Sequence, residues 1–116
     1  MAIQKFPASE LLNLPLRDWG HGKASGSSPP SRITGKKISV AGCTAGSYGI
    51  WEASQGTFVR EVETGEYMHI LSGECTFTGD DGIEVPIRSG DTLFFPPGTK
   101  GVWRVTTPVR KVYVML

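Results

Sequence analysis

The sequence has no block of like charges and no long apolar run. Its 12 Lys and Arg against 11 Asp and Glu leave a formal charge of +1, spread along 116 residues. Nucleic acids and anionic membranes attract clustered basic side chains, so neither is expected as a partner. No apolar stretch approaches the roughly 20 residues that a membrane-spanning helix needs. We therefore expect a soluble protein that binds neither nucleic acid nor membrane.

Cysteines are also few, and nothing resembles a targeting signal. Cys43 and Cys75 are too few for a disulfide scaffold in a chain of this length. Both lie among β-prone residues, where buried and unreactive thiols are expected. Residues 1–7 lack the apolar core of a secretory signal. These features predict a reducing, cytoplasmic setting.

Glycine and proline, by contrast, are abundant. The chain has 15 Gly and 8 Pro, a content typical of many tight turns and few long helices. One short helix is expected after Ser9, and Pro15 limits it. Residues 20–31 are a Gly, Ser and Pro-rich stretch with nothing to bury, and His21 within it is expected in solvent. Residues 1–35 are thus predicted to form an irregular N-terminal arm, which packs on the body or on a partner subunit.

From residue 36 onward, short β-prone runs alternate with turns. The absence of heptads and of βαβ alternation predicts one all-β domain over residues 36–116, a sandwich or small barrel. The expected strands cover residues 36–43, 47–53, 57–63, 67–71, 74–78, 83–87, 92–95, 101–106 and 109–116.

Two motifs carry a family resemblance. The first is EYMHILSGE at residues 66–74, a carboxylate followed by six residues and a strand-ending glycine. The second is GDTLFFPPG at residues 90–98, a tight turn leading into a strand that a Pro-x-Gly turn ends. In this order, separated by a hairpin, they resemble the two motifs of the cupin superfamily. The resemblance implies an RmlC-like jelly-roll barrel, usually homodimeric, with a ligand or metal site inside.

Further stretches narrow the resemblance to one branch of the superfamily. Residues 49–52, 98–105 and 109–114 are similar to single-domain cupins related to ureidoglycine aminohydrolase and to ethanolamine-utilisation Q-type proteins. The similarity covers residues 48–116. Cupins include isomerases, dioxygenases, hydrolases, storage proteins and plain binders, so the resemblance implies the fold and leaves the activity open.

The metal ligands that this resemblance implies are missing. Metal-binding cupins carry a His-x-His pair shortly before the motif glutamate, because residues i and i+2 of a strand share one face. One carboxylate, here Glu66, does not hold a transition metal against water. We therefore expect no metal and no cofactor. The histidine positions are occupied by Arg60 and Val62, or by Val59 and Glu61, and in the second motif by Gly101.

A carboxylate-rich ion site stays open as an alternative. It requires a bulge at residues 64–65 that turns Glu61 and Glu63 toward Glu66. Regular strand alternation instead turns Glu66 and His69 to opposite faces. On that alternation, Glu61 and Glu63 lie in solvent and His69 packs or faces a partner subunit.

Strand alternation also defines the expected pocket. If Glu66 points into the barrel, Met68 points with it, and Gly101, Trp103 and Val105 point inward from a later strand. A carboxylate in such a cavity is costly unless it is paired, and Arg60 is the nearest expected partner, with Lys100, Lys111 and Tyr113 as further candidates. Glu66 is the candidate catalytic residue. The candidate ligand-binding residues are Arg60, Glu66, Met68, Lys100, Trp103 and Tyr113.

Two functions are compatible with such a barrel. The favoured one is a homodimeric small-metabolite binding domain without chemistry, its core sealed in part by Phe94. The alternative is a metal-independent isomerase or hydrolase of a small polar metabolite, with Glu66 as general base or anchor and Arg60 or Lys100 holding an anionic group. A ureidoglycine aminohydrolase-like metalloenzyme is less favoured, because the ligands are missing. A solvent-open pocket with Glu66 at its floor favours the metabolite site, and a barrel filled by side chains favours a pure assembly module.

A homodimer is expected from the fold as well. Small jelly rolls leave unpaired strand edges that must be covered. The arm at residues 20–31 and the C-terminal strand at residues 112–116 are the segments expected to reach a second copy.

Overall fold

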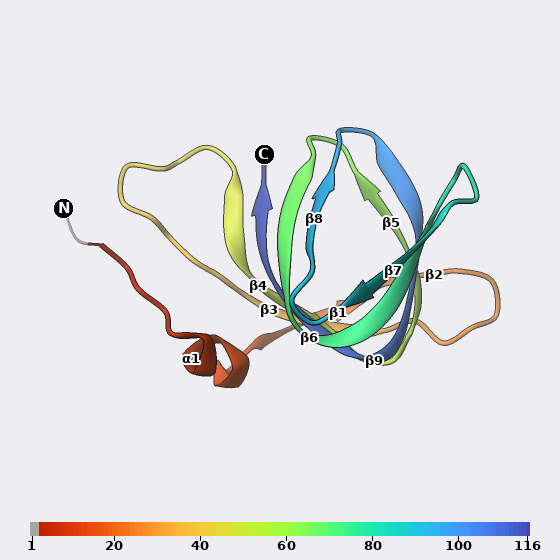
Figure 1. Ribbon diagram of the computed structural model, residues 1–116, viewed down its shortest axis with the longest axis horizontal. Coiled ribbons are helices and arrows are strands. Elements are labelled where there is room, and N and C mark those ends of the chain that lie inside the picture. Colours follow the sequence, from red (N-terminus) through yellow and green to blue (C-terminus); the bar gives the residue numbers. More distant parts are fainter. Residues whose placement is uncertain (1–2) are drawn as a thin grey trace.

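Nine strands and one short helix form within residues 3–116, which the computed structural model describes. The helix is α1 (Ala8–Asn13), which ends shortly before Pro15 as expected. Its position outside the sheet is visible in Figure 1. The strands are β1 (Arg17–His21), β2 (Lys23–Ala24), β3 (Arg32–Lys37), β4 (Ser47–Ala53), β5 (Gly56–Val62), β6 (Glu66–Gly79), β7 (Glu84–Arg88), β8 (Thr92–Phe95) and β9 (Thr99–Met115).

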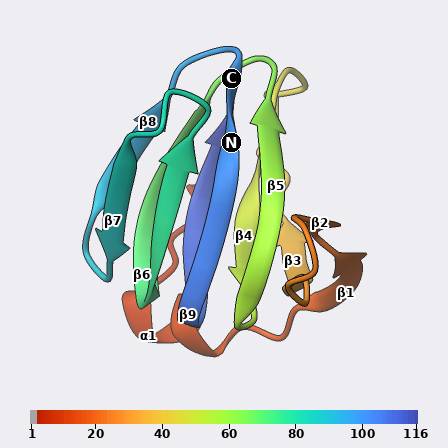
Figure 2. The same ribbon diagram turned by 90° about the vertical axis from the view of Figure 1, so that its right-hand side faces the viewer.

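The long strand β9 closes the sheet into a barrel. Its first half pairs with β5 and its second half with β4, while β6 runs antiparallel along its other side. Figure 2 shows β7, β6, β9 and β5 side by side across one wall. The remaining strands continue the sheet in the order β4, β3, β1, and β2 adds to β5. The predicted all-β, jelly-roll class of fold is confirmed.

Two pairs of predicted strands are single, bent strands. Residues 67–71 and 74–78 both belong to β6, and residues 101–106 and 109–116 both lie on β9, apart from Leu116. The register between β6 and β9 shifts around Ser72. Gly73 makes the bend because its φ is +94° and a Cβ there would lie 2.0 Å from the carbonyl oxygen of Pro108. Gly73, which the sequence predicts to end a strand, therefore produces a bend within β6.

The N-terminal segment contains more strand than the predicted irregular arm. β1 pairs with β3, β3 with β4, and β2 with β5. The bounds predicted for the strand over residues 36–43 are wrong. The observed strand is β3, and it ends at Lys37 because its ladder with β4 ends there. Residues 38–46 form a loop with one isolated bridge between Val40 and Cys43 among the described residues.

The two thiols differ in their surroundings. Cys75 is buried on β6, and burial raises its pKa to about 12. Cys43 is exposed, so the prediction that it is buried was wrong. It lies in the loop of residues 38–46, which no strand covers.

Aromatic side chains fill part of the barrel interior. The centroid of the Trp103 ring lies 6.2 Å from that of Phe58, 5.6 Å from that of Phe77 and 5.9 Å from that of Phe95. Gly101, Trp103 and Val105 are all buried, as strand alternation predicts. Phe94 is 73% exposed, which contradicts its expected place in the core. Alternation along β8 turns Phe95 inward and Phe94 outward.

The described residues contain one short helix, α1. Among residues 3–116, no helix has the length and apolar character to span a membrane.

Candidate functional site

A cavity of about 400 Å³ opens at one end of the barrel. Strands β1, β2, β4, β5, β6 and β9 all contribute to its lining. Glu66 and Lys111 are its most buried charged residues, whereas Arg60 and Lys23 line its more exposed part. Its apolar lining includes Trp19, Trp51, Phe58, Tyr113 and Met115.

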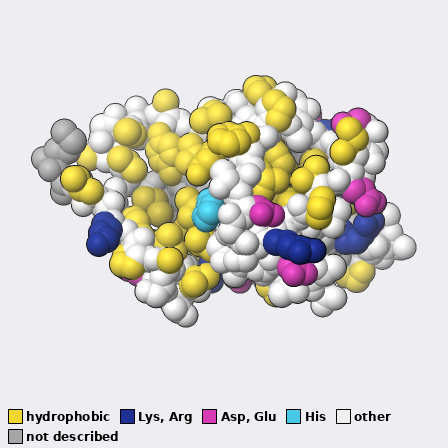
Figure 3. Space-filling view, in the orientation of Figure 1, with side chains coloured by type: hydrophobic (Ala, Val, Ile, Leu, Met, Phe, Trp, Pro, Cys, Tyr) yellow, Lys and Arg dark blue, Asp and Glu magenta, His cyan; other side chains and the backbone are white. Residues whose placement is uncertain are grey.

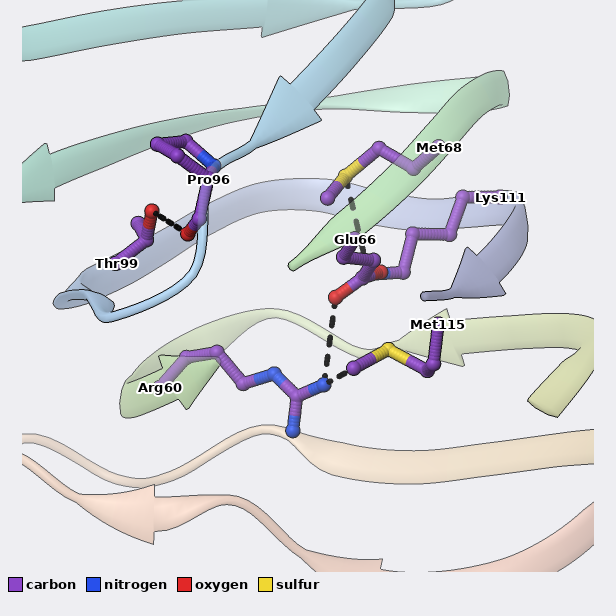
Figure 4. A network of polar contacts seen from close by, with 7 residues as sticks. All are labelled: Arg60, Glu66, Met68, Pro96, Thr99, Lys111 and Met115. Atoms are coloured by element: carbon purple, nitrogen blue, oxygen red, sulfur yellow. Dashed lines mark hydrogen bonds and ion pairs between the residues drawn. The ribbon is translucent and has the colours of Figure 1, made fainter. Parts of the chain in front are cut away.

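Glu66 is held between two cations. It is the first residue of β6, follows the turn at residues 64–65, and is 1% exposed. Its Oε2 accepts a hydrogen bond from Lys111 Nζ at 2.6 Å, and its Oε1 accepts one from Arg60 Nη2 at 3.3 Å. Figure 4 shows the two cations approaching the carboxylate from β9 and β5. Both carboxylate oxygens are therefore engaged, so Glu66 is suited to anchoring charge.

Lys111 is enclosed by aromatic rings as well as by the carboxylate. Its Nζ lies 4.3 Å from the Trp51 ring centroid and 5.1 Å from that of Trp103. The sulfur of Met68 lies 3.8 Å away. Burial is the main cause that lowers the pKa of Lys111, the Glu66 carboxylate opposes it, and the Arg60 charge adds to the lowering. An amine with this surrounding loses its proton more readily than an exposed lysine.

Arg60 reaches the cluster from the solvent side. Its side chain is 40% exposed, and Nη2 also contacts the Met115 sulfur at 3.8 Å. Both contacts use Nη2, so within residues 3–116 the Nε and Nη1 donors stay available to a ligand in the cavity. An arginine can bind a carboxylate through two such donors at once.

The charge of the cavity favours anions. Arg60, Lys23 and Lys111 line it, against Glu66 as the one acidic residue that the described chain contributes to its lining. His21, predicted to be a solvated loop residue, is exposed at the end of β1 and also lines the cavity. A concave, partly apolar site with a few convergent charged groups is the usual form of a small-molecule site.

The predicted pocket residues divide into three groups. Arg60, Glu66 and Tyr113 line the cavity together, as expected. Met68 and Trp103 are buried behind it, where Trp103 belongs to the aromatic core. Lys100 is exposed and lines a different hollow of the surface.

Sequence reasoning underrated Lys111 and missed the N-terminal contribution. Val109, Lys111 and Tyr113 are all buried on one face of β9, in the same alternation that places Trp103 inward. Extending that alternation past Val105 would have placed Lys111 inside the barrel. Trp19 reaches the cavity because β1 pairs with β3, which no local pattern in the sequence indicates.

The cupin metal positions do not fit a metal ion in this chain. A guanidinium, Arg60, already contacts the motif glutamate, and a cation cannot share that position with a metal. At Gly101 a Cβ would lie 2.3 Å from the Thr78 carbonyl oxygen, so the sheet leaves no room for a ligating side chain. Within residues 3–116, no three His, Cys, Asp or Glu residues group as a metal site would require.

The alternative carboxylate-rich site is not assembled. Glu61 and Glu63 are exposed, whereas Glu66 is buried inside the barrel. His69 lies on the opposite face of β6, where its Nδ1 is 3.0 Å from the Thr92 hydroxyl. Regular alternation along β6 therefore holds through this stretch.

An apolar row crosses the outside of the barrel. Tyr48, Val114, Tyr67 and Phe94 are successive cross-strand neighbours on β4, β9, β6 and β8. The rings of Tyr67 and Phe94 are 5.1 Å apart. Figure 3 shows hydrophobic side chains grouped over the region of these strands. We refer to these four residues as the outer row.

Comparison with known proteins agrees with this architecture. Residues 40–113 match the EutQ-like cupin domain. This chain belongs to the EutQ-like cupin family. No curated protein matches it.

Solved structures of other EutQ-like and related cupins are similar to it. A DUF861 family protein of Thermotoga maritima is 36% identical over 60% of this chain and 78% of its own, with a TM-score of 0.58. The EutQ protein of Clostridium difficile is 24% identical over 72% of this chain and 67% of its own, with a TM-score of 0.64. A Salmonella typhimurium protein assigned as ethanolamine utilization protein EutQ is 18% identical over 86% of this chain and 92% of its own, again at 0.64.

Proposed function

We propose that this EutQ-like cupin binds a small carboxylate metabolite in the barrel cavity, with the Arg60–Glu66–Lys111 cluster in place of metal ligands. The observation that carries the proposal is a buried carboxylate held between two cations in a cavity of about 400 Å³. A buried ion network is no better for stability than apolar packing of the same volume. Its presence beside a cavity therefore supports a role in recognition.

The ligand's charge follows from which donors are free. Glu66 accepts hydrogen bonds from Lys111 and from one nitrogen of Arg60, which leaves the other guanidinium donors of a cavity-lining arginine for an anionic ligand. Lys23 and His21 add positive charge or hydrogen-bond donors at the cavity's exposed side. Trp51 and Tyr113 offer apolar contact to the rest of a small organic acid.

Binding without chemistry at Glu66 is favoured over the alternatives. A general base that starts a reaction needs an oxygen free to take the substrate's proton. Both Glu66 oxygens already accept hydrogen bonds from cations, so the first proton that Glu66 can take is one that its partner Lys111 gives up. This speaks against an isomerase or hydrolase that uses Glu66 as its base. The misfit at Arg60 and Gly101 speaks against a ureidoglycine aminohydrolase-like metalloenzyme.

The test compares small carboxylates with their primary amides by thermal shift and calorimetry. We expect acetate, lactate, pyruvate or succinate to bind and the uncharged amides not to bind. Arg60→Gln should weaken binding on the order of tenfold or more, because a charge-assisted hydrogen bond is lost. Arg104→Gln is the matched control, since Arg104 is exposed on β9 outside the cavity. Equal effects of both variants, or equal binding of amides, would contradict the proposal.

We further propose that the working form is a homodimer that buries the outer row. Phe94 is 73% exposed on β8, and both β7 and β8 pair only with β6 within the described chain. The C-terminal strand cannot provide the exchange that its sequence suggests, because β9 is already paired with β4 and β6 there. An apolar sheet face and unpaired edges are instead the surfaces to cover.

Light scattering after gel filtration tests the dimer. We expect twice the chain mass for the wild type and a shift toward the monomer for Phe94→Ser. Ile83→Ser is the matched control, because Ile83 is 63% exposed but lies outside the outer row. A monomeric wild type would contradict this part of the proposal. A cytoplasmic location is also part of it, supported by the two free thiols at Cys43 and Cys75.

A further inference from the structure

Lys111 has a position that anion binding alone does not explain. Its Nζ is an amine in the lining of a cavity, 2.6 Å from a carboxylate and covered by two indole rings. A lysine that only binds an anion does not need to be buried. At an exposed rim, where Lys23 lies, the ammonium has no desolvation cost to overcome. A buried lysine beside an acid has the arrangement that nucleophilic amines require.

The surroundings provide both a proton acceptor and a reason for proton loss. Burial lowers the pKa of Lys111, although Glu66 and the attraction of the indole rings for a cation oppose this. The lowered pKa leaves more free amine than an exposed lysine has at the same pH. Glu66 Oε2 lies where it can take the proton and return it.

We propose that Lys111 forms an imine with a small 2-oxo acid whose carboxylate binds Arg60. This inference rests on the carboxylate binding proposed above and names the class of carboxylate. Arg60 Nη2 and Lys111 Nζ contact different oxygens of one carboxyl group, so they lie close together. A molecule with a carbonyl directly beside its carboxylate can place the carboxylate at the Nε and Nη1 donors of Arg60 and the carbonyl at Lys111 Nζ, and a cavity of about 400 Å³ holds a molecule of this size.

The step is balanced by the residues present. Lys111 gives one proton to Glu66, and its nitrogen lone pair attacks the carbonyl carbon as the carbon–oxygen π bond breaks. The oxygen takes the proton from Glu66, which leaves a carbinolamine with a cationic nitrogen. A second proton then moves from the nitrogen through Glu66 to the hydroxyl group, water departs, and the carbon–nitrogen double bond forms. The sum is one ammonium and one ketone giving one protonated imine and one water.

The product fits the site that the ammonium occupies. A protonated imine keeps the positive charge, so the Glu66 pair and the contacts with Trp51 and Trp103 retain their partner. The indole rings also keep bulk water from the bond, which slows its hydrolysis. No oxidant, metal or further cofactor enters the step.

Reductive trapping tests the inference on the unaltered chain. The protein is incubated with pyruvate or glyoxylate and sodium cyanoborohydride, and the adduct is located by peptide mass spectrometry. We expect one adduct per chain at Lys111, formed faster than at exposed Lys100, because burial leaves more free amine at Lys111 at the same pH. Lys111→Arg keeps the charge and should abolish trapping. Lys100→Gln, outside the cavity, should leave it in place.

The outcomes separate this inference from the function on which it rests. Calorimetric binding of pyruvate and lactate alike, with no adduct at Lys111, would overturn the imine and leave carboxylate binding standing. Equal labelling of exposed lysines would also overturn it. Absence of binding for every carboxylate would overturn both proposals. An adduct confined to Lys111, together with weaker binding of lactate than of pyruvate, supports both.

Discussion

Among single residues, Glu66 is central to the buried cluster, because each of its two oxygens accepts a hydrogen bond from a different cation. Lys111 is 3% exposed in its side chain, so its pair with Glu66 is shielded from solvent, whereas the Arg60 contact is partly screened. Removing one member of a shielded pair leaves the other charged and buried. Single substitutions in this cluster are therefore expected to change the stability of the fold.

Glu66→Gln is expected to destabilise the fold without changing its shape. The amide keeps the volume but leaves Lys111 without its counter-charge, at a cost of about 3 kcal/mol in the free energy of unfolding. Urea denaturation followed by circular dichroism measures the difference. Glu63→Gln is the control, because Glu63 is exposed and its replacement should change stability by less than about 0.5 kcal/mol. Equal stability of Glu66→Gln and wild type would show that the pair does not form in solution.

Lys111 also predicts a pH dependence of stability. Burial lowers the pKa of Lys111 in the folded chain below its ordinary 10.5, so between the two values the unfolded chain binds more protons. The contribution of Lys111 to the free energy of unfolding therefore increases as the pH rises between these two pKa values, and it is constant above pH 10.5.

The measurement is the free energy of unfolding of wild type minus that of Lys111→Met, taken at several pH values up to about 10.5. We expect the difference to grow with pH. Cys75, whose pKa is raised to about 12, acts in the opposite direction above pH 9. The charge of Lys111 lowers the pKa of Cys75, so both proteins carry Cys75→Ala in this comparison. A difference that falls with pH would mean that the folded state raises the pKa of Lys111.

Among the elements, β9 organises the barrel, because its 17 residues contact β4, β5 and β6 in turn. Gly101 lies where β5 and β6 both pair with it, opposite Arg60 and Gly79. The absence of a side chain there lets β6 approach closely.

Gly101→Ala is expected to lower stability by about 1–3 kcal/mol, the usual cost of overpacking. A Cβ would lie 2.3 Å from the Thr78 carbonyl oxygen and 2.9 Å from the Gly79 Cα, and both are backbone atoms that yield only if the strands separate. Thermal unfolding measures the loss, with Arg104→Ala on the exposed face of β9 as control. A melting temperature for Gly101→Ala equal to that of the control would mean that the sheet has room at this point.

Strand alternation was the most reliable guide from sequence to structure. It placed Glu66, Met68 and Trp103 inside and Val102 and Arg104 on the less buried face, because the side-chain period of two is local. The extent of β6 and β9 could not be predicted, because a bend at Gly73 and a strand end have the same local sequence. The ladder of β1 with β3 depends on a partner far along the chain, so the segment was predicted as irregular.

At the scale of the whole molecule, the site exists because the barrel brings distant segments together. Trp19, Trp51, Arg60, Glu66 and Lys111 come from five different strands. The sequence could indicate Arg60 and Glu66, because one turn separates them and Glu66 begins a recognisable motif. The sequence could not indicate Trp19, because Trp19 reaches the cavity only through the pairing of the N-terminal strands.

The assembled cluster also predicts the metal content of the protein. Arg60 and Gly101 lie at positions where the cupin resemblance implies metal ligands, and Glu66 is already paired with two cations. Protein expressed with added Mn, Fe, Ni and Zn and then dialysed should retain far less than one metal ion per chain in elemental analysis. A near-stoichiometric metal that Glu66→Gln abolishes would mean that the ion pairs give way to coordination.

Binding of a small carboxylate at this cluster is best tested by a crystal structure grown with pyruvate. We expect electron density in the cavity with the ligand's carboxylate on Arg60 and its carbonyl carbon beside Lys111 Nζ. Density elsewhere on the barrel with this cavity holding solvent, or a metal ion bound to Glu66 with Lys111 displaced, would contradict it.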